Sequence, residues 1–233
     1  VASRLSAPLL PARVAWRPDT MDPAGAPRAR PPVEGRDAHP LLEGVPAIEI
    51  VRYAELKRAG LLILGDGQED EGAGDTLKEL ADAVVRRADV PCLILPTGQD
   101  RLARTLVALD GSERGMRALR VAWGMRAIQD GELTAMYVST EREQRAGVVG
   151  PPGARAQEIG ARVTETLGPG SGVAVLHRRG DVVDEVLRGL SAEAGDLLVV
   201  GVRRGGPADP SESTGEGRRL LAAARCAVLT VPL

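Results

Sequence analysis

GVPAIEIVRYAELKRAGLLILG (residues 44–65) and GDVVDEVLRGLSAEAGDLLVVG (residues 180–201) can be laid over each other without a gap, at a constant offset of 136 residues. The same register continues to the closing apolar runs, so that LILP ending at Pro96 meets LTVP ending at Pro232. Identity elsewhere is low, but glycines, apolar runs and the closing proline keep the same order in both copies. Because such a shared register marks one folding unit that is present twice, we predict an internal repeat.

The length of 233 residues leaves room for two domains that each bury a core of their own. We place an incomplete domain at residues 1–100 and a complete domain at residues 101–233. Several residues recur identically at the constant offset: Gly44 and Gly180, Glu49 and Glu185, and Arg52 and Arg188.

The composition is typical of a soluble globular protein. A formal net charge of −2 and the absence of Phe disfavour nucleic-acid binding, which uses basic surfaces and aromatic stacking platforms. No apolar run approaches the roughly 20 residues that cross a membrane, and Arg and Pro interrupt the opening stretch, unlike a secretory segment. We interpret Cys92 and Cys226 as small buried hydrophobic residues. We therefore expect no metal, no redox cofactor and a cytoplasmic location.

Strands and helices alternate along the second copy. Short apolar runs predict strands at residues 104–109, 133–138, 173–176, 197–200 and 227–231. Helical spacing of apolar residues predicts a helix from the N-cap Ser112 to about residue 130, one containing Ile159, Val163 and Leu167, and others at residues 182–190 and 213–224. Strands that are apolar almost throughout indicate a parallel α/β sheet covered on both faces, with residues 197–200 buried at its centre.

The first copy is less complete. Residues 13–16 can serve as its second strand, a linker containing Pro and Arg follows at residues 17–32, and the repeat is whole from Leu41 onward. By comparison with residues 104–138, a first strand and most of a helix should precede Val1. We therefore expect a chain that was cut or processed upstream.

Four motifs of the second copy, taken in order, carry a resemblance to a known family. They are VALDGS (residues 107–112), RRGDVVDEV (178–186), DLLVVG (196–201) and AVLTVP (227–232). Residues 104–233 resemble a universal stress protein domain, and residues 41–96 resemble it more thinly. The chain is thus similar to a tandem universal stress protein whose first domain lacks its start. The resemblance implies two doubly wound α/β domains, each a parallel five-stranded sheet of order 3-2-1-4-5, the first lacking its first strand.

The resemblance also implies a nucleotide site at the carboxyl ends of the first and fourth strands, a topological switch point. In ATP-binding members an aspartate meets the ribose or adenine, a branched apolar residue lines the adenine pocket, and a glycine-rich loop with a helix N-terminus receives the phosphates. The matching candidates for cofactor binding are Ala108, Asp110, Val138, Gly201, Arg203, Arg204, Gly205, Thr214, Gly215 and Glu216.

The phosphate loop departs from the family form, which is Gly, two residues, Gly, nine residues, Gly, then Ser or Thr. Gly201 stands at the first glycine, but Arg204 takes the place of the second, and Thr214 and Gly215 close the loop in reverse order of type. A shift by one residue restores Gly205 and Gly215 as a pair with nine residues between them.

In either register Glu216 lies in the first turn of the helix that follows the loop. A carboxylate about 4 Å from a phosphate would cost about 4 kcal/mol at an effective dielectric constant of 20. Inward-turned Arg203 and Arg204 would offset that cost. Alternatively, Ser213 and Glu216 form a Ser-x-x-Glu capping box, which stabilises a helix without any ligand. ATP is therefore a candidate ligand of the second domain only.

The corresponding loop of the first copy, GDGQEDEGAGDT (residues 65–76), carries five carboxylates that repel phosphate. We interpret it as a solvated acidic loop, because its spacing does not match a calcium-binding EF-hand. A catalytic triad is not indicated either. His39 lies in the linker stretch before Leu41, and His177 is interpreted as a surface imidazole beside two arginines.

These observations favour a non-enzymatic stress-response protein whose second domain senses an adenine nucleotide and whose first domain is structural. One alternative is a nucleotide-free interaction or regulatory module, such as a transporter tail. A third, an ATP-hydrolysing enzyme, is disfavoured because the phosphate loop lacks a lysine or a well-placed hydroxyl. The closing runs at residues 92–96 and 227–231 would lie at sheet edges, so we expect them to join the two domains as a pseudo-dimer, with a homodimer as a further option.

Overall fold

The structure is a computed structural model. It describes residues 13–15, 41–65, 73–99, 101–129, 131–141, 153–202 and 215–232. No helix among these residues combines the length and the apolar character needed to cross a bilayer.

The second half folds as the alternating pattern predicts. Its strands are β5 (Arg104–Leu109), β6 (Glu132–Ser139), β7 (Ala174–Arg179), β8 (Leu197–Val202) and β9 (Ala227–Pro232). Its helices are α3 (Glu113–Gln129), α5 (Ala154–Leu167), α6 (Val182–Ala192) and α7 (Glu216–Ala223). Within this half, neighbouring strands are parallel and lie in the order β7-β6-β5-β8-β9. This is the expected order 3-2-1-4-5.

The first half differs from the single incomplete sheet that we expected. Its elements are β1 (Arg13–Ala15), β2 (Leu41–Glu43), α1 (Pro46–Leu56), β3 (Leu62–Gly65), α2 (Ala73–Val85) and β4 (Cys92–Leu95). β1 and β2 form a separate parallel pair, whereas β3 and β4 form a parallel pair within the large sheet. In the order 3-2-1-4-5 the first strand is the central one. Without a strand in that place, the described part of the first half falls into two pieces.

The closing strands of the two halves lie side by side. β4 and β9 pair antiparallel, with Cys92 opposite Thr230, Leu93 opposite Leu229 and Ile94 opposite Val228. The result is one seven-stranded sheet in the order β3-β4-β9-β8-β5-β6-β7. Leu93 and Leu229 are equivalent positions of the repeat, so the pairing is symmetric about them.

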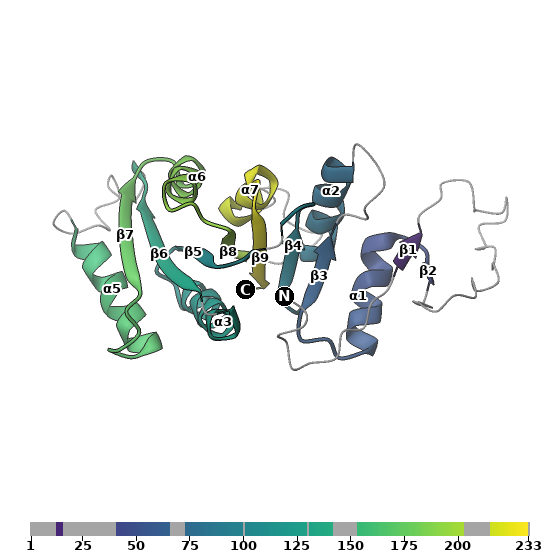
Figure 1. Ribbon diagram of the computed structural model, residues 1–233, viewed down its shortest axis with the longest axis horizontal. Coiled ribbons are helices and arrows are strands. Elements are labelled where there is room, and N and C mark those ends of the chain that lie inside the picture. Colours follow the sequence, from purple (N-terminus) through teal and green to yellow (C-terminus); the bar gives the residue numbers. More distant parts are fainter. Residues whose placement is uncertain are drawn as a thin grey trace.

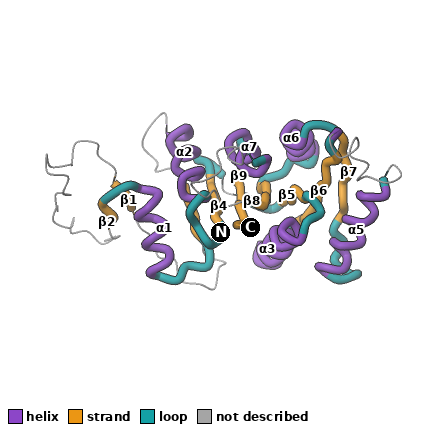
Figure 2. The backbone as a smooth tube through the Cα atoms, turned by 180° about the vertical axis from the view of Figure 1, so that it is seen from behind, coloured by secondary structure: helices purple, strands orange, loops and turns teal. Residues whose placement is uncertain are grey.

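Helices cover both faces of the sheet. Figures 1 and 2 show α2, α7 and α6 in a row on one face, and α3 and α5 on the other. The core accordingly has two clusters, one under each layer. The predicted central run Leu197–Val200 contributes alternately to both clusters, and each of its residues is at most 1% exposed. This confirms the prediction that β8 is buried on both faces.

The repeated sequence gives repeated backbone geometry. Gly44 and Gly180 both have left-handed φ angles, of 140° and 145°, directly before the loop that enters α1 and α6. Beside each glycine lies the side chain of the glutamate five residues later, so that a Cβ there would stand 2.9 Å or 3.2 Å from its Cγ. Arg52 and Arg188 in turn form ion pairs with Glu49 and Glu185. The identical residues of the two copies therefore build the entry to a helix.

Candidate functional site

A pocket opens at the carboxyl ends of β5 and β6, where α6 and α7 begin. It has a cavity volume of about 150 Å³. The lining residues are Ala108, Leu109, Asp110, Met136, Tyr137, Val138, Thr140, Val182, Val186 and Glu216. The pocket therefore lies at the carboxyl end of β5, beside the predicted topological switch point between β5 and β8.

Asp110 forms the polar rim of the pocket, directly after β5. Its Oδ1 accepts hydrogen bonds from the backbone N–H of Ser112 at 2.9 Å and from the Ser112 hydroxyl at 2.7 Å. Ser112 Oγ in turn accepts from the backbone N–H of Gly115 at 3.1 Å, so it caps α3 as predicted. A Cβ at Gly115 would stand 2.6 Å from Asp110 Oδ1, so only glycine leaves room for this carboxylate. The Asp-Gly-Ser turn thus holds Asp110 in one orientation.

The inner wall of the pocket is apolar. Met136 and Val138 from β6 are 0% and 5% exposed, and Val186 of α6 is 1% exposed. α6 starts at this wall because Asp181 caps it, accepting hydrogen bonds from the backbone N–H groups of Val183 at 2.9 Å and Asp184 at 3.2 Å. These hydrogen bonds hold the pKa of Asp181 below its usual value, and the bond from the Asp184 N–H has the largest effect. The combination of an apolar wall and one carboxylate suits a flat ring with polar edges.

Glu216 lies on the opposite rim and corrects our capping prediction. α7 begins at Glu216, and its N-cap is Gly215, which makes no side-chain capping hydrogen bond. Glu216 is therefore the first residue of the helix, whereas a Ser-x-x-Glu box would place it third. The reason is local, because Gly215 has a non-helical backbone (φ −52°, ψ 142°) and the helix can begin only after it, at Glu216. At this position the carboxylate interacts favourably with the helix dipole and lines the pocket.

The structure brings together four of the candidate site residues: Ala108, Asp110, Val138 and Glu216. Gly201 is the second-last residue of β8 and Gly215 caps α7, but neither lines the pocket. Arg203, Arg204, Gly205 and Thr214 lie outside the described residues, as do Ser213 and His39. The acidic residues 66–72 of the first half lie outside them too.

Several lining residues were not among the candidates. Val182 and Val186 are four residues apart in the first turns of α6, and this helical spacing, next to the Gly180–Asp181 helix start, was the available signal. Met136 and Tyr137 carried no such signal, because neighbouring residues of a strand point to opposite faces and the sequence does not say which face meets the ligand.

His177 is not the surface imidazole that we predicted. It lies at the carboxyl end of β7, with its ring stacked on Tyr137 at 5.5 Å and an interplanar angle of 13°. Its Nε2 lies 2.9 Å from Oγ of Ser139, which is 1% exposed. Burial, and then the charge of Arg179, lower the pKa of His177. The imidazole thus packs against Tyr137 beside the pocket.

The two cysteines are free thiols and behave as hydrophobic residues. Cys92 is 1% exposed, and burial raises its pKa to about 12, although a hydrogen bond with Thr230 acts in the opposite direction. Burial also raises the pKa of Cys226. Thiols with raised pKa values are poor nucleophiles and poor metal ligands. Within the described ranges, no group of three or more His, Cys, Asp or Glu side chains is placed to hold a metal ion.

Comparison with known proteins points to one family. The model of the universal stress protein family matches residues 102–232, which is more than half of the chain. Comparison with curated proteins gives no sequence match.

Solved structures of the same fold extend over more of the chain. A universal stress protein from Archaeoglobus fulgidus DSM 4304 is similar over 83% of this chain and 67% of its own, with 19% identity and a TM-score of 0.59. A functionally unknown protein from Pseudomonas aeruginosa PAO1 is similar over 83% and 71%, with 12% identity and a TM-score of 0.58. At these identities the similarity concerns the fold.

Proposed function

The chain belongs to the universal stress protein family, and from this premise we propose that its second half binds an adenine nucleotide. The base enters the pocket between β6 and α6, and Asp110 accepts a hydrogen bond from the ribose or the base. The protein acts by binding and not by catalysis, as a cytoplasmic sensor of the nucleotide. The first half is a related, incomplete domain with a structural role.

One observation carries the proposal. Ala108, Asp110 and Val138 are separated in sequence by up to 30 residues, and the fold brings all three to the same small cavity. The cavity of about 150 Å³ suits a single ring system more than a whole nucleotide, so the phosphates would extend beyond it, past the start of α7. The apolar wall then provides surface against which the base packs, and the Asp110 carboxylate fixes the orientation of the ligand through a hydrogen bond.

Glu216 supports the second candidate, a nucleotide-free interaction module. Its carboxylate lies on the pocket rim at the helix start where phosphates would pass. A negative charge there opposes a polyphosphate, though it would not oppose an uncharged nucleoside. Affinity that decreases from adenosine to ATP would therefore indicate that the pocket reads the nucleoside and Glu216 rejects the phosphates.

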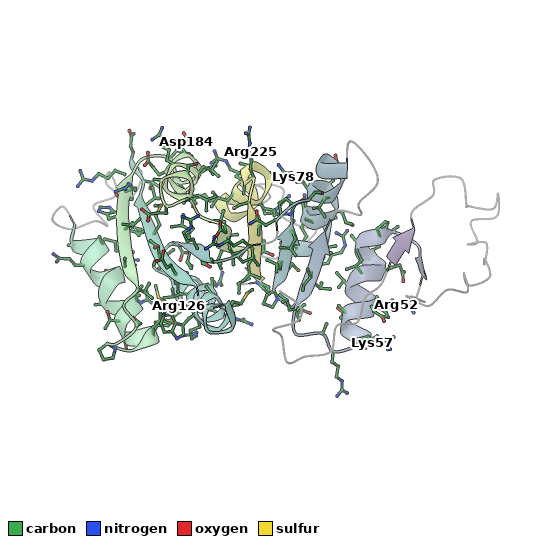
Figure 3. All side chains as sticks on the ribbon, in the orientation of Figure 1. Arg52, Lys57, Lys78, Arg126, Asp184 and Arg225 are labelled. Atoms are coloured by element: carbon green, nitrogen blue, oxygen red, sulfur yellow. The ribbon has the colours of Figure 1, made fainter. Side chains whose placement is uncertain are left out.

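Calorimetric titration of the whole protein with adenosine, AMP and ATP tests the proposal. We expect binding that Asp110→Ala weakens by roughly 10- to 100-fold, the effect of losing a hydrogen bond to a charged group. Asp184→Ala is the matched control, since Asp184 is an exposed carboxylate on α6 outside the pocket (Figure 3). A protein that binds none of the three ligands at millimolar concentration would support the interaction module instead. Turnover of bound ATP would support an enzyme.

A further inference from the structure

The two halves meet not only through β4 and β9 but also through a charged contact between α2 and α7. The guanidinium of Arg218 donates two hydrogen bonds to the Asp82 carboxylate, from Nε to Oδ1 at 2.6 Å and from Nη2 to Oδ2 at 2.8 Å. The two side chains are only 16% and 29% exposed. Arg86, the residue directly after α2, also donates hydrogen bonds to the Asp82 carboxylate. Burial raises the pKa of Asp82, but the hydrogen bonds from Arg218 and Arg86 lower it further, below its usual value.

Asp82 and Arg218 are equivalent positions of the repeat, separated by the constant offset of 136 residues. The same is true of Leu93 and Leu229, about which the β4–β9 pairing is symmetric. Two equivalent positions that touch each other lie on the axis that relates the copies. The ion pair therefore lies on the local two-fold axis. The two helices that carry it, α2 and α7, lie next to each other beside the strand pair β4 and β9 (Figure 1). Lys78 flanks the ion pair, donating to the carbonyl of Ala222 at 3.0 Å (Figure 3).

On such an axis, the same residue faces itself whenever two identical units pair. Two β9 strands from separate chains, meeting in this register, would bring Arg218 against Arg218. Two β4 strands would bring Asp82 against Asp82. The strands themselves discriminate poorly, because Leu faces Leu at the axis in every combination and the flanking residues are small or branched. Only the combination of β4 with β9 places opposite charges on the axis.

We propose that the Asp82–Arg218 pair is a specificity determinant, which directs β4 to β9 and rejects the pairing of either strand with its own copy in another molecule. The partner that this surface fits is thus the other half of the repeat. The two hydrogen bonds between Arg218 and Asp82 favour the pairing of β4 with β9. In the other pairings, like charges would face each other and repel. Because the segment between β4 and β5 is short, the high effective concentration favours pairing within one chain. This inference does not depend on nucleotide binding.

Charge reversal in the whole protein tests the proposal. The three variants are Asp82→Arg, Arg218→Asp and the double exchange, with Arg120→Asp as a control that reverses an exposed arginine on α3, on the other face of the sheet. We expect each single reversal to lower the urea midpoint more than the control does, and the double exchange to restore it. We also expect the two single variants, each unable to pair well with itself, to form a heterodimer when mixed, as measured by sedimentation velocity.

Restoration by the double exchange, or a heterodimer seen only in the mixture, supports the proposal. Single variants with the wild-type midpoint would overturn it, as would a double variant no more stable than the weaker single one. Homodimers of Asp82→Arg alone would also overturn it, because the axis would then tolerate two arginines. If a charge-reversed variant fails to fold, the neutral variants Asp82→Asn and Arg218→Gln are made singly and together in its place. A combined loss of stability smaller than the sum of the two single losses would then support coupling across the axis.

Discussion

The first and second halves share one structural unit but not one binding site. α1 and α6 span equivalent residues, and left-handed residues recur at their ends as Arg58 (φ 50°) and Ala194 (φ 45°). The unit from the glycine before the helix to the strand after it is thus the same in both halves. What differs is the strand that should lie beside it. β5 fills that place in the second half, whereas the described residues of the first half supply no equivalent strand.

This difference shows which features depend on local sequence and which depend on the whole sheet. The helix entry forms in both halves because its glycine, glutamate and arginine lie within nine residues of one another. The pocket needs β5, because this strand carries Ala108, leads directly into Asp110, and pairs with β6 on one side and β8 on the other. A half without the central strand keeps its local units but cannot assemble the site.

The largest expected effect concerns the two equivalent leucines of β8 and β3. Leu198 is fully buried, so we expect Leu198→Ala to lower the free energy of unfolding by about 2–5 kcal/mol. Leu62, its counterpart in the first half, is only partly buried, and Leu62→Ala should cost roughly 1 kcal/mol. Urea denaturation of both variants measures the difference. Equal losses would show that β3 is as well packed as β8 and would remove the contrast between the halves.

The proposed nucleotide binding should separate the two halves in function. We expect Glu216→Ser to tighten ATP binding by about 1 kcal/mol, or several-fold, because it removes a negative charge from the phosphate path at an exposed helix start. Binding of adenosine should stay unchanged, since the charge opposes phosphate only. Glu165→Ser, the same change on the exposed surface of α5, serves as the control. Weaker ATP binding by Glu216→Ser would mean that this carboxylate belongs to a working site of a different design.

A smaller effect tests the difference between the two helix entries. Asp181 caps α6 with its side chain, whereas Val45, its counterpart, makes no side-chain capping hydrogen bond at α1 and is 58% exposed. Val45→Ser should therefore stabilise the protein by about 0.5–1 kcal/mol, as a serine at an N-cap accepts a hydrogen bond that valine cannot. Val45→Ala is the control and should give no gain. Thermal and urea midpoints of the three proteins decide the matter, and an equal gain for alanine would refute the capping explanation.

The link between the halves should be sensitive to acid. The pKa of Asp82 in the folded protein lies below its unfolded value of about 3.8, so the carboxylate stabilises the fold above that value. This contribution is lost as the pH falls through the folded pKa, because protonation removes the charge that Arg218 and Arg86 bind. Asp82→Asn should therefore lose stability at neutral pH and show less further loss between about pH 5 and pH 2. Parallel pH curves for the two proteins would show that Asp82 does not contribute.

Much of the second half could be predicted because its signals are local. Strand 104–109 and the cap at Ser112 were placed correctly from an apolar run followed by Asp-Gly-Ser. The start of α7 was wrong, since Ser-x-x-Glu describes a capping box only if the serine begins the helix, and here Gly215 does. His177 was misjudged for a different reason. Its ring stacks on Tyr137 from the neighbouring strand and is only partly exposed, and the sequence around His177 does not predict a contact with another strand.

The sequence by itself determined the alternation of strands and helices, because those signals depend on residues a few positions apart. It also determined the repeat and its register, because the two copies can be compared directly. Tertiary structure alone decided that the first half divides into two sheet pieces and that Asp82 meets Arg218 on the axis between the halves. The physical reason is distance along the chain. Contacts between residues more than 100 positions apart arise only when strands pair and helices pack on them, and the offset of 136 residues became a symmetry axis only once β4 met β9.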